Sequence, residues 1–323
     1  MSFPLLRAFP LRRAAYQFGL VAAVACVGWY VVSNTMHNLE TRKIASGFAF
    51  LAREAGFEIG ETTLIAYGAA DSYLRALTVG LLNTFRVALI GVVCATLLGV
   101  LIGLARLSSN WLVARLAGVY VEVMRNIPLI VQLFFWYAVI AENLPGPREA
   151  LNPFPGVFLS NRGIVFPTPW STPVLEGFNF SGGIALTPEF AALLGGLVIY
   201  TAAFIAEIVR AGVLAVDKGQ HEAAASLGLS RWRTIRLVIL PQALRVMVPP
   251  MTSQFLNLTK NSSLAVAIGY PDLVSIANTT INQTGQAIEG IAIIMLVFLT
   301  ISLSISAFMN WYNGRIALRG AAR

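Results

Sequence analysis

Hydrophobic residues along this chain gather in long runs that are separated by shorter polar segments. A helix needs about 20 apolar residues to cross the hydrocarbon core of a bilayer. Six runs approach or reach that length, and each predicts a transmembrane helix: residues 16–33, 83–104, 119–141, 190–209, 243–258 and 288–311. The fifth run is the least regular, because Pro249 and Pro250 interrupt it. The pattern therefore predicts an all-α integral membrane protein with six transmembrane helices.

The composition strengthens this interpretation and excludes several classes of protein. The chain is 57% hydrophobic and only 12% charged, whereas a soluble domain is about 25% charged. Its net charge of +8 could indicate nucleic-acid binding, but the basic residues stand in short clusters between apolar runs, which membrane orientation explains better. Metalloprotease, phosphate-loop and nucleophile-elbow motifs are missing from the sequence. We expect no nucleic-acid partner, no catalytic residue and no metal or cofactor bound by this chain.

Lysine and arginine mark the cytoplasmic ends of transmembrane helices. Three arginines precede the first run, and the other clusters fall between the second and third runs, between the fourth and fifth, and after the sixth. With six spans all of them lie on one side, which places both termini in the cytoplasm. These residues are Arg7, Arg12, Arg13, Arg106, Arg115, Arg210, Lys218, Arg231, Arg233, Arg236, Arg315, Arg319 and Arg323.

The first run has two interpretations, a cleaved signal peptide or a retained signal-anchor helix. Its basic start suits both, but no clear small-x-small cleavage site follows it. We therefore expect a retained helix.

Two segments on the outer side are long. Residues 34–80 are mixed polar, and their acidic residues balance their basic ones. Residues 142–189 contain eight prolines, a density that forbids a regular helix. The sequence leaves two readings of this second segment open: a surface loop that only connects two spans, or a contact for a partner outside the membrane.

Small residues recur at every fourth position of the second run, at Gly91, Ala95, Gly99 and Gly103. Such a ridge lets another backbone approach closely. We expect it to pack against a second helix, either of this chain or of a partner.

Two Glu–Arg pairs at spacing i, i+3 stand near the inferred cytoplasmic surface, Glu122 with Arg125 and Glu207 with Arg210. Each pair is close enough to interact on one helix face. Charge neutralisation at the interface is the simpler explanation, and a hinge contact to a cytoplasmic loop is the alternative. Pro128 removes a helical hydrogen bond and predicts a kink in the third span.

The fifth run contains a polar stripe. Ser253, Asn257 and Lys260 follow one another at i, i+4 and i+7, with Gln254 and Asn261 beside them. Polar residues in a membrane helix normally face protein or water and not lipid. We expect this stripe to line a translocation path, with simple binding to neighbouring helices as the alternative. The apolar piece that follows, ending at residues 269–271, is too short to span and predicts a partial helix at the outer end.

The loop between the fourth and fifth spans predicts two short helices. Residues 217–227 favour a helix through their alanines, and Gly228 can adopt the left-handed conformation that ends it. Ser230 can cap a second helix that stops near Pro241. A DNA-binding helix-turn-helix is the alternative, but a loop held between two spans could not easily enter a major groove.

At this point the residues resemble a known family. Glu222-Ala223-Ala224, then Gly228, then Val238-x-Leu240-Pro241 is similar to the signature of bacterial ABC importer permeases, with Val238 in place of isoleucine. Residues 122–132 and 258–264 resemble the corresponding segments of polar amino-acid permeases. The likeness covers about residues 80–315 and is greatest to the Q-type permease subunit of general L-amino-acid importers. Some members of that group carry an added pair of spans before the fourth span, which this chain lacks.

The resemblance implies a type I importer transmembrane domain with an added N-terminal helix, in a bacterial inner membrane. It implies that Glu222, Ala223, Ala224, Gly228 and Pro241 couple the permease to an ATPase. It divides the chain into an N-terminal helix and outer segment (1–78), a transmembrane domain (79–311) with its coupling loop (217–241), and a cytoplasmic tail (312–323).

The implied function is the uptake of polar L-amino acids. ATP and Mg would be bound by partner ATPase subunits, and the other partners would be a second permease, a periplasmic amino-acid-binding protein and membrane lipid. An ion-coupled secondary transporter is the alternative, but it would need carboxylates in the middle of a span. A membrane scaffold would not need the polar stripe.

Overall fold

The computed structural model describes residues 11–41 and 46–316. Arg7, Arg319 and Arg323, which entered the orientation argument, lie outside the described residues. The helices are α1 (Leu11–Thr41), α2 (Tyr73–Arg106), α3 (Trp111–Asn126), α4 (Leu129–Ala141), α5 (Pro188–Leu214), α6 (Lys218–Ser226), α7 (Arg231–Thr234), α8 (Leu240–Asn261), α9 (Leu273–Thr284) and α10 (Ala287–Ile316).

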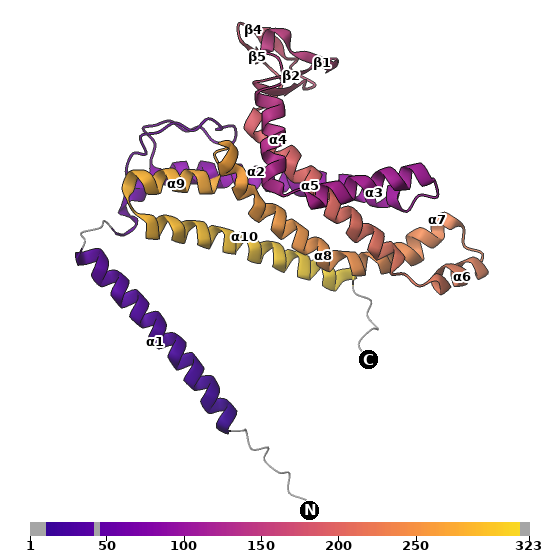
Figure 1. The fold of residues 1–323 in the computed structure, drawn as a ribbon, viewed down its shortest axis with the longest axis horizontal. Helices are drawn as coiled ribbons and strands as arrows, with labels where there is room; N and C mark the ends of the chain where they lie inside the picture. The colour runs from indigo at the N-terminus through magenta and orange to yellow at the C-terminus, as the bar shows by residue number, and fades with distance from the viewer. Residues whose placement is uncertain (1–10, 42–45, 317–323) are drawn as a thin grey trace, which may run out of the picture.

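Within this described part, four helices are long and apolar enough to cross a membrane, namely α1, α2, α5 and α10. Two further spans are bent: α3 with α4, and the stretch Arg231–Ile268 with α9. Counting each bent pair once gives six, so the predicted number of spans and the all-α membrane class are confirmed. Figure 1 shows α6 and α7 at one end of the helical body and α9 at the other.

The third span differs from its prediction, because it is two helices that meet at 105° and not one kinked helix. Pro128 forces the preceding residue out of the helical region, and Ile127 is extended at φ −89°, ψ 126°. The break frees backbone carbonyls, and Gln132 satisfies two of them. Its Nε2 donates to the carbonyl oxygens of Met124 at 2.9 Å and of Ile127 at 3.1 Å.

The fifth span is more regular than predicted. Pro249 and Pro250 lie inside α8 without interrupting it. The helix that begins after Ser230 also does not stop at Pro241. It continues through a π-helical turn, Ile235–Ile239, directly into α8. Pro241 is the second residue of α8, directly after this π-helical turn. The rod from α7 to α8 therefore carries no break at its prolines.

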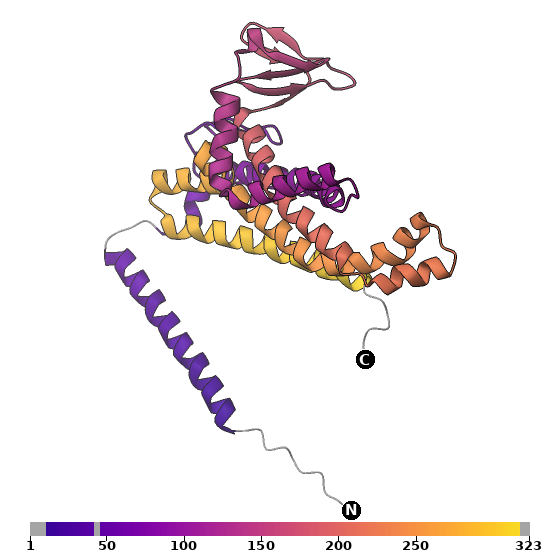
Figure 2. The ribbon, with the colours of Figure 1, turned by 45° about the vertical axis from the view of Figure 1, so that its right-hand side comes forward.

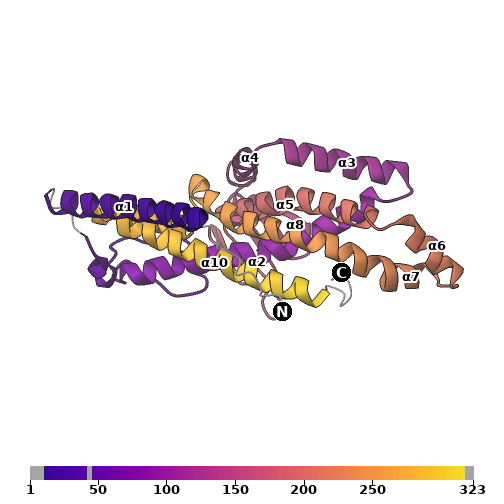
Figure 3. The ribbon, with the colours of Figure 1, turned by 90° about the horizontal axis from the view of Figure 1, so that it is seen from below.

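The small-residue ridge of α2 packs against α5 of the same chain. The predicted close packing is therefore confirmed, and the helix it packs against belongs to this chain and not to a partner. A methyl group added at Gly99 would lie 2.6 Å from Cβ of Ile205, and one at Gly103 would lie 2.7 Å from Cβ of Val209. Only glycine allows backbones to approach this closely. Seen from below in Figure 3, α3 and α10 lie on opposite sides with α5 and α8 between them.

The segment between α4 and α5 is a small β-structure, which agrees with the expectation that its prolines exclude a regular helix, although the strands themselves were not predicted. An antiparallel sheet has the order β1-β2-β3-β6, and β4 pairs with β5 as a hairpin. The ring of Phe158 stacks on that of Phe180 at 4.5 Å and joins the two parts. Of the prolines only Pro153 lies in a strand, at the sheet edge, where no ladder hydrogen bond is lost. Figure 2 shows the sheet at the end of α4, and Ile164 of β3 and Leu186 of β6 pack against the helical core. The strands are β1 (Leu151–Phe154), β2 (Val157–Ser160), β3 (Gly163–Phe166), β4 (Val174–Glu176), β5 (Asn179–Ser181) and β6 (Ile184–Leu186).

Residues 46–72 form a strap, here called the N-terminal strap, across the ends of α2, α9 and α10. The backbone N–H of Gly47 donates to Glu289 at 2.5 Å, and Nε2 of Gln286 donates to the carbonyl of Gly47 at 3.1 Å. Nδ2 of Asn83 donates to the carbonyls of Glu61 at 2.9 Å and of Pro271 at 3.0 Å. The strap thus connects three helices, while α1, which precedes it, projects away from the body (Figures 1 and 2).

Candidate functional site

The short helix α6 presents an exposed face at one end of the molecule. Its N-cap is Asp217, whose Oδ1 accepts from the N–H of Gly219 at 2.6 Å. Glu222 and Ala223 are exposed, whereas Ala224 is 3% exposed and packs inward. The helix predicted here is therefore present, with Ala224 buried beneath it and the side chains of Lys218, His221 and Glu222 exposed.

The turn after α6 has the predicted left-handed residue. Gly228 has φ +71°, and its N–H donates to the carbonyl of Ala225 at 2.9 Å. The turn brings two large apolar side chains to the surface, Leu227 at 80% exposed and Trp232 at 68% exposed. Exposed apolar side chains beside a polar helix mark a contact surface. The sequence reasoning did not single out Leu227, since its exposure follows from the turn.

α6 is linked directly to α8. Nε2 of Gln242, in the first turn of α8, donates to Oε1 of Gln220 at 3.2 Å and to the carbonyl of Val238 at 2.9 Å. Close packing of α5 on α8 follows at Gly212, where an added methyl would lie 2.4 Å from Cγ of Met247. α6 therefore contacts the rod directly, at the π-helical turn and at the first turn of α8.

One of the two predicted Glu–Arg pairs forms. Nη2 of Arg210 lies 2.5 Å from Oε1 of Glu207, and Arg106 of α2 joins the same carboxylate. These groups tie α2 to α5 near the end that leads to α6. The other predicted pair is wrong within the described residues: the guanidinium of Arg125 lies over the ring of Phe204 at 5.1 Å, and Glu122 is exposed.

The polar stripe of α8 lies on the open side of that helix. Ser253, Asn257 and Lys260 are exposed, whereas Gln254 and Asn261 are partly buried. The neighbouring Leu258 and Thr259, by contrast, face the helical body and are buried. Among the residues that the structure describes, none covers these three exposed side chains. Exposed polar groups on a membrane helix require water or a second protein beside them.

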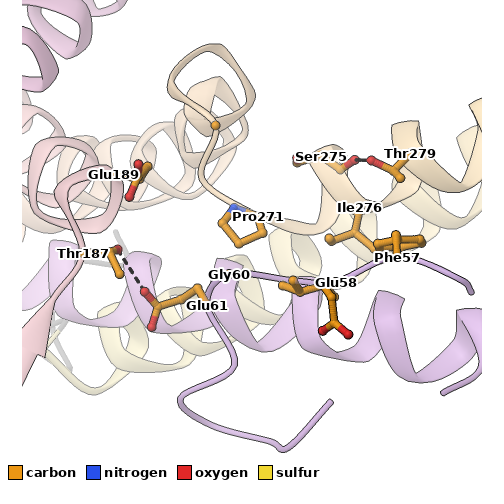
Figure 4. Close-up of a pocket in the computed structure, with 12 residues that line it drawn as sticks. Phe57, Glu58, Gly60, Glu61, Thr187, Glu189, Pro271, Ser275, Ile276 and Thr279 are labelled. Atoms are coloured by element: carbon orange, nitrogen blue, oxygen red, sulfur yellow. Dashed lines mark hydrogen bonds between the residues drawn. The ribbon is translucent and has the colours of Figure 1, made fainter. Parts of the chain in front are cut away.

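A pocket of about 400 Å³ lies at the opposite end from α6, between the strap, the start of α5 and α9 (Figure 4). The 27 residues of α5 rise about 40 Å between these two ends, more than the roughly 30 Å hydrocarbon thickness of a bilayer. The sequence reasoning missed this pocket, because it treated the acidic residues of the strap only as charge balance. Its lining residues are Phe57, Glu58, Ile59, Gly60, Glu61, Thr187, Glu189, Gly269, Pro271, Ser275, Ile276 and Thr279.

Glu61 is the organising group of this pocket. It is 5% exposed, its Oε1 lies 2.6 Å from Nη1 of Arg86, and its Oε2 accepts from Oγ1 of Thr187 at 3.0 Å. A buried carboxylate is stable only when it is paired and hydrogen-bonded in this way. The Glu61 carboxylate thus joins the strap, α2 and the N-cap of α5.

Elsewhere in the strap, burial raises the pKa of the Tyr67 hydroxyl, and the charges of Asp71 and Glu58 raise it further.

Residues 95–318, more than half of the chain, match the family of binding-protein-dependent transport system inner membrane components. The chain belongs to this family. Membership supports an ATP-driven importer subunit over the ion-coupled transporter that the sequence left open.

This permease is 48% identical to the putative amino-acid ABC transporter permease protein YhdX of Escherichia coli, over 93% of this chain and 92% of that one. It is 42% identical to the general L-amino acid transport system permease protein AapQ of Rhizobium johnstonii, over 95% and 92% of the two chains. The first alignment extends over 364 positions, more than the 323 residues of this permease. That relative therefore contains residues with no counterpart here.

Two solved structures share the fold. A crystal structure of an amino acid ABC transporter with histidines has a TM-score of 0.56 at 28% identity, over 75% of this permease and 95% of that chain. An inward-facing MetNI methionine ABC transporter has a TM-score of 0.54 at 16% identity, over 76% and 98%. This permease therefore has the type I ABC importer transmembrane fold.

Proposed function

We propose that this chain is the permease subunit of an ATP-driven importer that carries polar L-amino acids across the bacterial inner membrane. The observation that carries the proposal is its similarity to amino-acid permeases along nearly the whole chain. YhdX and AapQ are both described as amino-acid permeases. A third relative, 38% identical, is the glutamate/glutamine/aspartate/asparagine transport system permease protein BztB of Rhodobacter capsulatus.

The exposed face of α6 is the proposed contact for the ATPase subunits, which would bind ATP and Mg. Glu222 and Ala223 lie on it, and Leu227 and Trp232 beside it supply apolar area. When the ATPases close, α6 moves with them, and the link from Gln242 passes that motion to α8. Pro241 and Gly228 keep the geometry of this connection, one in the first turn of α8 and one in the turn after α6.

A second permease subunit would face the polar stripe of α8 and close the translocation path. The stripe is exposed in this chain, and lipid would leave its amides and ammonium without partners. Every amino-acid substrate carries a carboxylate, so a positive charge at Lys260 would attract it. The path would therefore run between two permeases, whether identical or paralogous.

On the opposite end a soluble binding protein would deliver the amino acid to the surface formed by the strap, the sheet and α9. With α6 in the cytoplasm, the six spans place both termini there as well, in agreement with the clusters of basic residues. The sheet then lies outside the membrane.

The test is reconstitution of the chain with its ATPase and partner permease in proteoliposomes. We expect uptake of radiolabelled glutamate or glutamine. This uptake should require ATP on the side of the membrane that α6 faces and binding protein on the opposite side. Glu222→Lys should release the ATPase and stop uptake. Glu176→Lys, an equivalent change at an exposed carboxylate of β4, should leave ATPase retention unchanged. Uptake by the chain alone under an ion gradient would overturn the proposal.

A further inference from the structure

A groove of about 450 Å³ runs along the surface between α2, α8 and α10, on the helices that the membrane would surround. Thr259, Ile301 and Met309 are at most 8% exposed and form its base. Leu89 and Phe308, at 71% and 61% exposed, form its rim. The groove is therefore a cleft with apolar walls and not a flat helix face.

Its hydroxyl groups need no ligand. Oγ1 of Thr259, Oγ1 of Thr300 and Oγ of Ser304 each donate to the carbonyl four residues earlier in their own helix, at 2.9, 2.7 and 2.8 Å. Hydroxyls that donate in this way offer an occupant no free O–H donor. The rest of the lining is apolar, so the groove suits an apolar occupant.

The chain itself has an apolar helix, α1, that is tethered to the start of α10. α1 ends at Thr41, and Gly47 is bonded to Gln286 and Glu289 where α10 begins. The six residue steps from Thr41 to Gly47 reach at most about 20 Å. One end of α1 is consequently held near the start of α10, and a helix that returns through the bilayer from there runs antiparallel to α10.

The depths agree as well. Cys26 lies 15 residues before Thr41, or about 22 Å along α1. Thr300 and Ser304 lie 13 and 17 residues after Ala287, or about 20 and 26 Å along α10. With Thr41 level with Ala287, an antiparallel α1 brings Cys26 to the depth of the groove.

One face of α1 is suited to close packing. Ala15, Gly19, Ala22 and Cys26 follow at i, i+4, i+7 and i+11, so they share one face. Small side chains at such spacing let helices approach closely in a membrane. The other side of the helix is bulkier, with exposed residues that include Leu20, Val24 and Val31.

We propose that in the membrane α1 lies antiparallel along α10, with its small-residue face in the groove between α2, α8 and α10 of the same chain. The strap then serves as the tether that sets depth and direction. α1 is in this arrangement an integral part of the helical body and not only an anchor.

Disulfide trapping in membranes that contain the assembled transporter tests this arrangement. Cys94→Ala removes the other native cysteine, and Cys26 is paired with Ser304→Cys in the groove. The matched control is Ile90→Cys, which lies 17 residues after the start of α2, as Ser304 does in α10, but outside the groove. A protease site inserted at residues 42–45 separates α1 from the body after oxidation.

We expect the α1 fragment to stay attached to the body of one chain in the Ser304→Cys variant, with a yield several-fold above that of Ile90→Cys. Ala22→Trp, on the small-residue face, should lower that yield, and Val24→Trp, on the other side, should leave it unchanged. Attachment to a second copy, seen at twice the mass before cleavage, would overturn the proposal. So would equal yields at the two positions, or equal labelling of Ser304→Cys by a lipid-soluble maleimide with and without residues 1–45.

Discussion

Substituting alanine for Gly99 adds a single methyl group at the contact between α2 and α5. That carbon would lie 2.6 Å from both Cβ and Cγ2 of Ile205 and 3.0 Å from the carbonyl oxygen of Ala202. Ordinary contacts of a Cβ atom begin at 3.4 Å. Ile205 is fully buried and β-branched, so its side chain has no other rotamer to adopt. The helices must therefore separate by roughly 0.8 Å, the difference between 3.4 and 2.6 Å, and a gap of that size forfeits a quarter to a half of the local dispersion energy.

The expected cost is about 1–3 kcal/mol of unfolding free energy, the range for an extra methylene forced into a packed core. With an unfolding entropy of about 2.1 cal/mol/K per residue over 323 residues, each kcal/mol lowers the melting temperature by roughly 1.5 °C. Thermal unfolding of the purified permease in detergent, followed by tryptophan fluorescence, measures this shift at matched detergent and lipid.

Gly195→Ala is the matched control in α5. A methyl group at Gly195 would meet no atom within 4 Å, apart from its own helix backbone and chain neighbours, and alanine favours a helix over glycine by up to about 1 kcal/mol. The control should melt at or slightly above the parent temperature. If Gly99→Ala melts no lower than Gly195→Ala, the ridge of α2 does not hold α5 as described.

Three further outcomes are expected. Gly228→Val should insert normally but lose ATP-driven uptake, because a β-branched residue resists φ +71°. Gly228→Asn should retain much of the uptake, and normal uptake by the valine variant at equal expression would contradict this prediction. In the uptake assay Lys260→Arg should keep partial activity, Lys260→Met should lose much and Lys260→Glu most, because a positive charge attracts the substrate carboxylate; a methionine variant equal to the parent at all substrate concentrations would make Lys260 an anchor only. A cysteine at Gly219 should react with a membrane-impermeant maleimide only from the cytoplasm and one at Gly156 only from outside; labelling of residue 219 from the periplasm would refute the orientation.

Much of the fold could be predicted from rules that act between residues close together in the sequence. The length of an apolar run decides whether a helix can span, so six spans could be counted from the sequence, although α2 and α8 extend beyond the predicted bounds. The two helices around Gly228 were also predicted, because helix-favouring alanines and a left-handed glycine act on neighbouring residues only. Ser230 precedes the second helix as predicted, but its side chain makes no capping hydrogen bond, whereas Asp217 caps α6. The coupling roles given to these residues and the division into domains remain predictions.

Other features depended on contacts between distant parts of the chain. The 105° bend at Pro128 is held by Gln132, whose two acceptors lie across the break, so proline alone indicated a kink but not its size. The sheet between α4 and α5 forms by pairing β3 with β6 across 17 intervening residues. No local pattern specifies such a pairing when the strands are three or four residues long.

The sequence by itself determined which segments are apolar enough to span, where the polar stripe of α8 lies along its helix, and, to within one residue at each end, where α6 begins and ends. Only the tertiary structure decided which way that stripe faces, because burial of Leu258 against the body turns Asn257 outward. The tertiary structure also decided the pocket around Glu61, because Arg86 of α2 and Thr187 at the start of α5 must come together around this carboxylate. Helix formation depends on neighbours in sequence, whereas the exposure and charge of a side chain depend on what the fold places beside it.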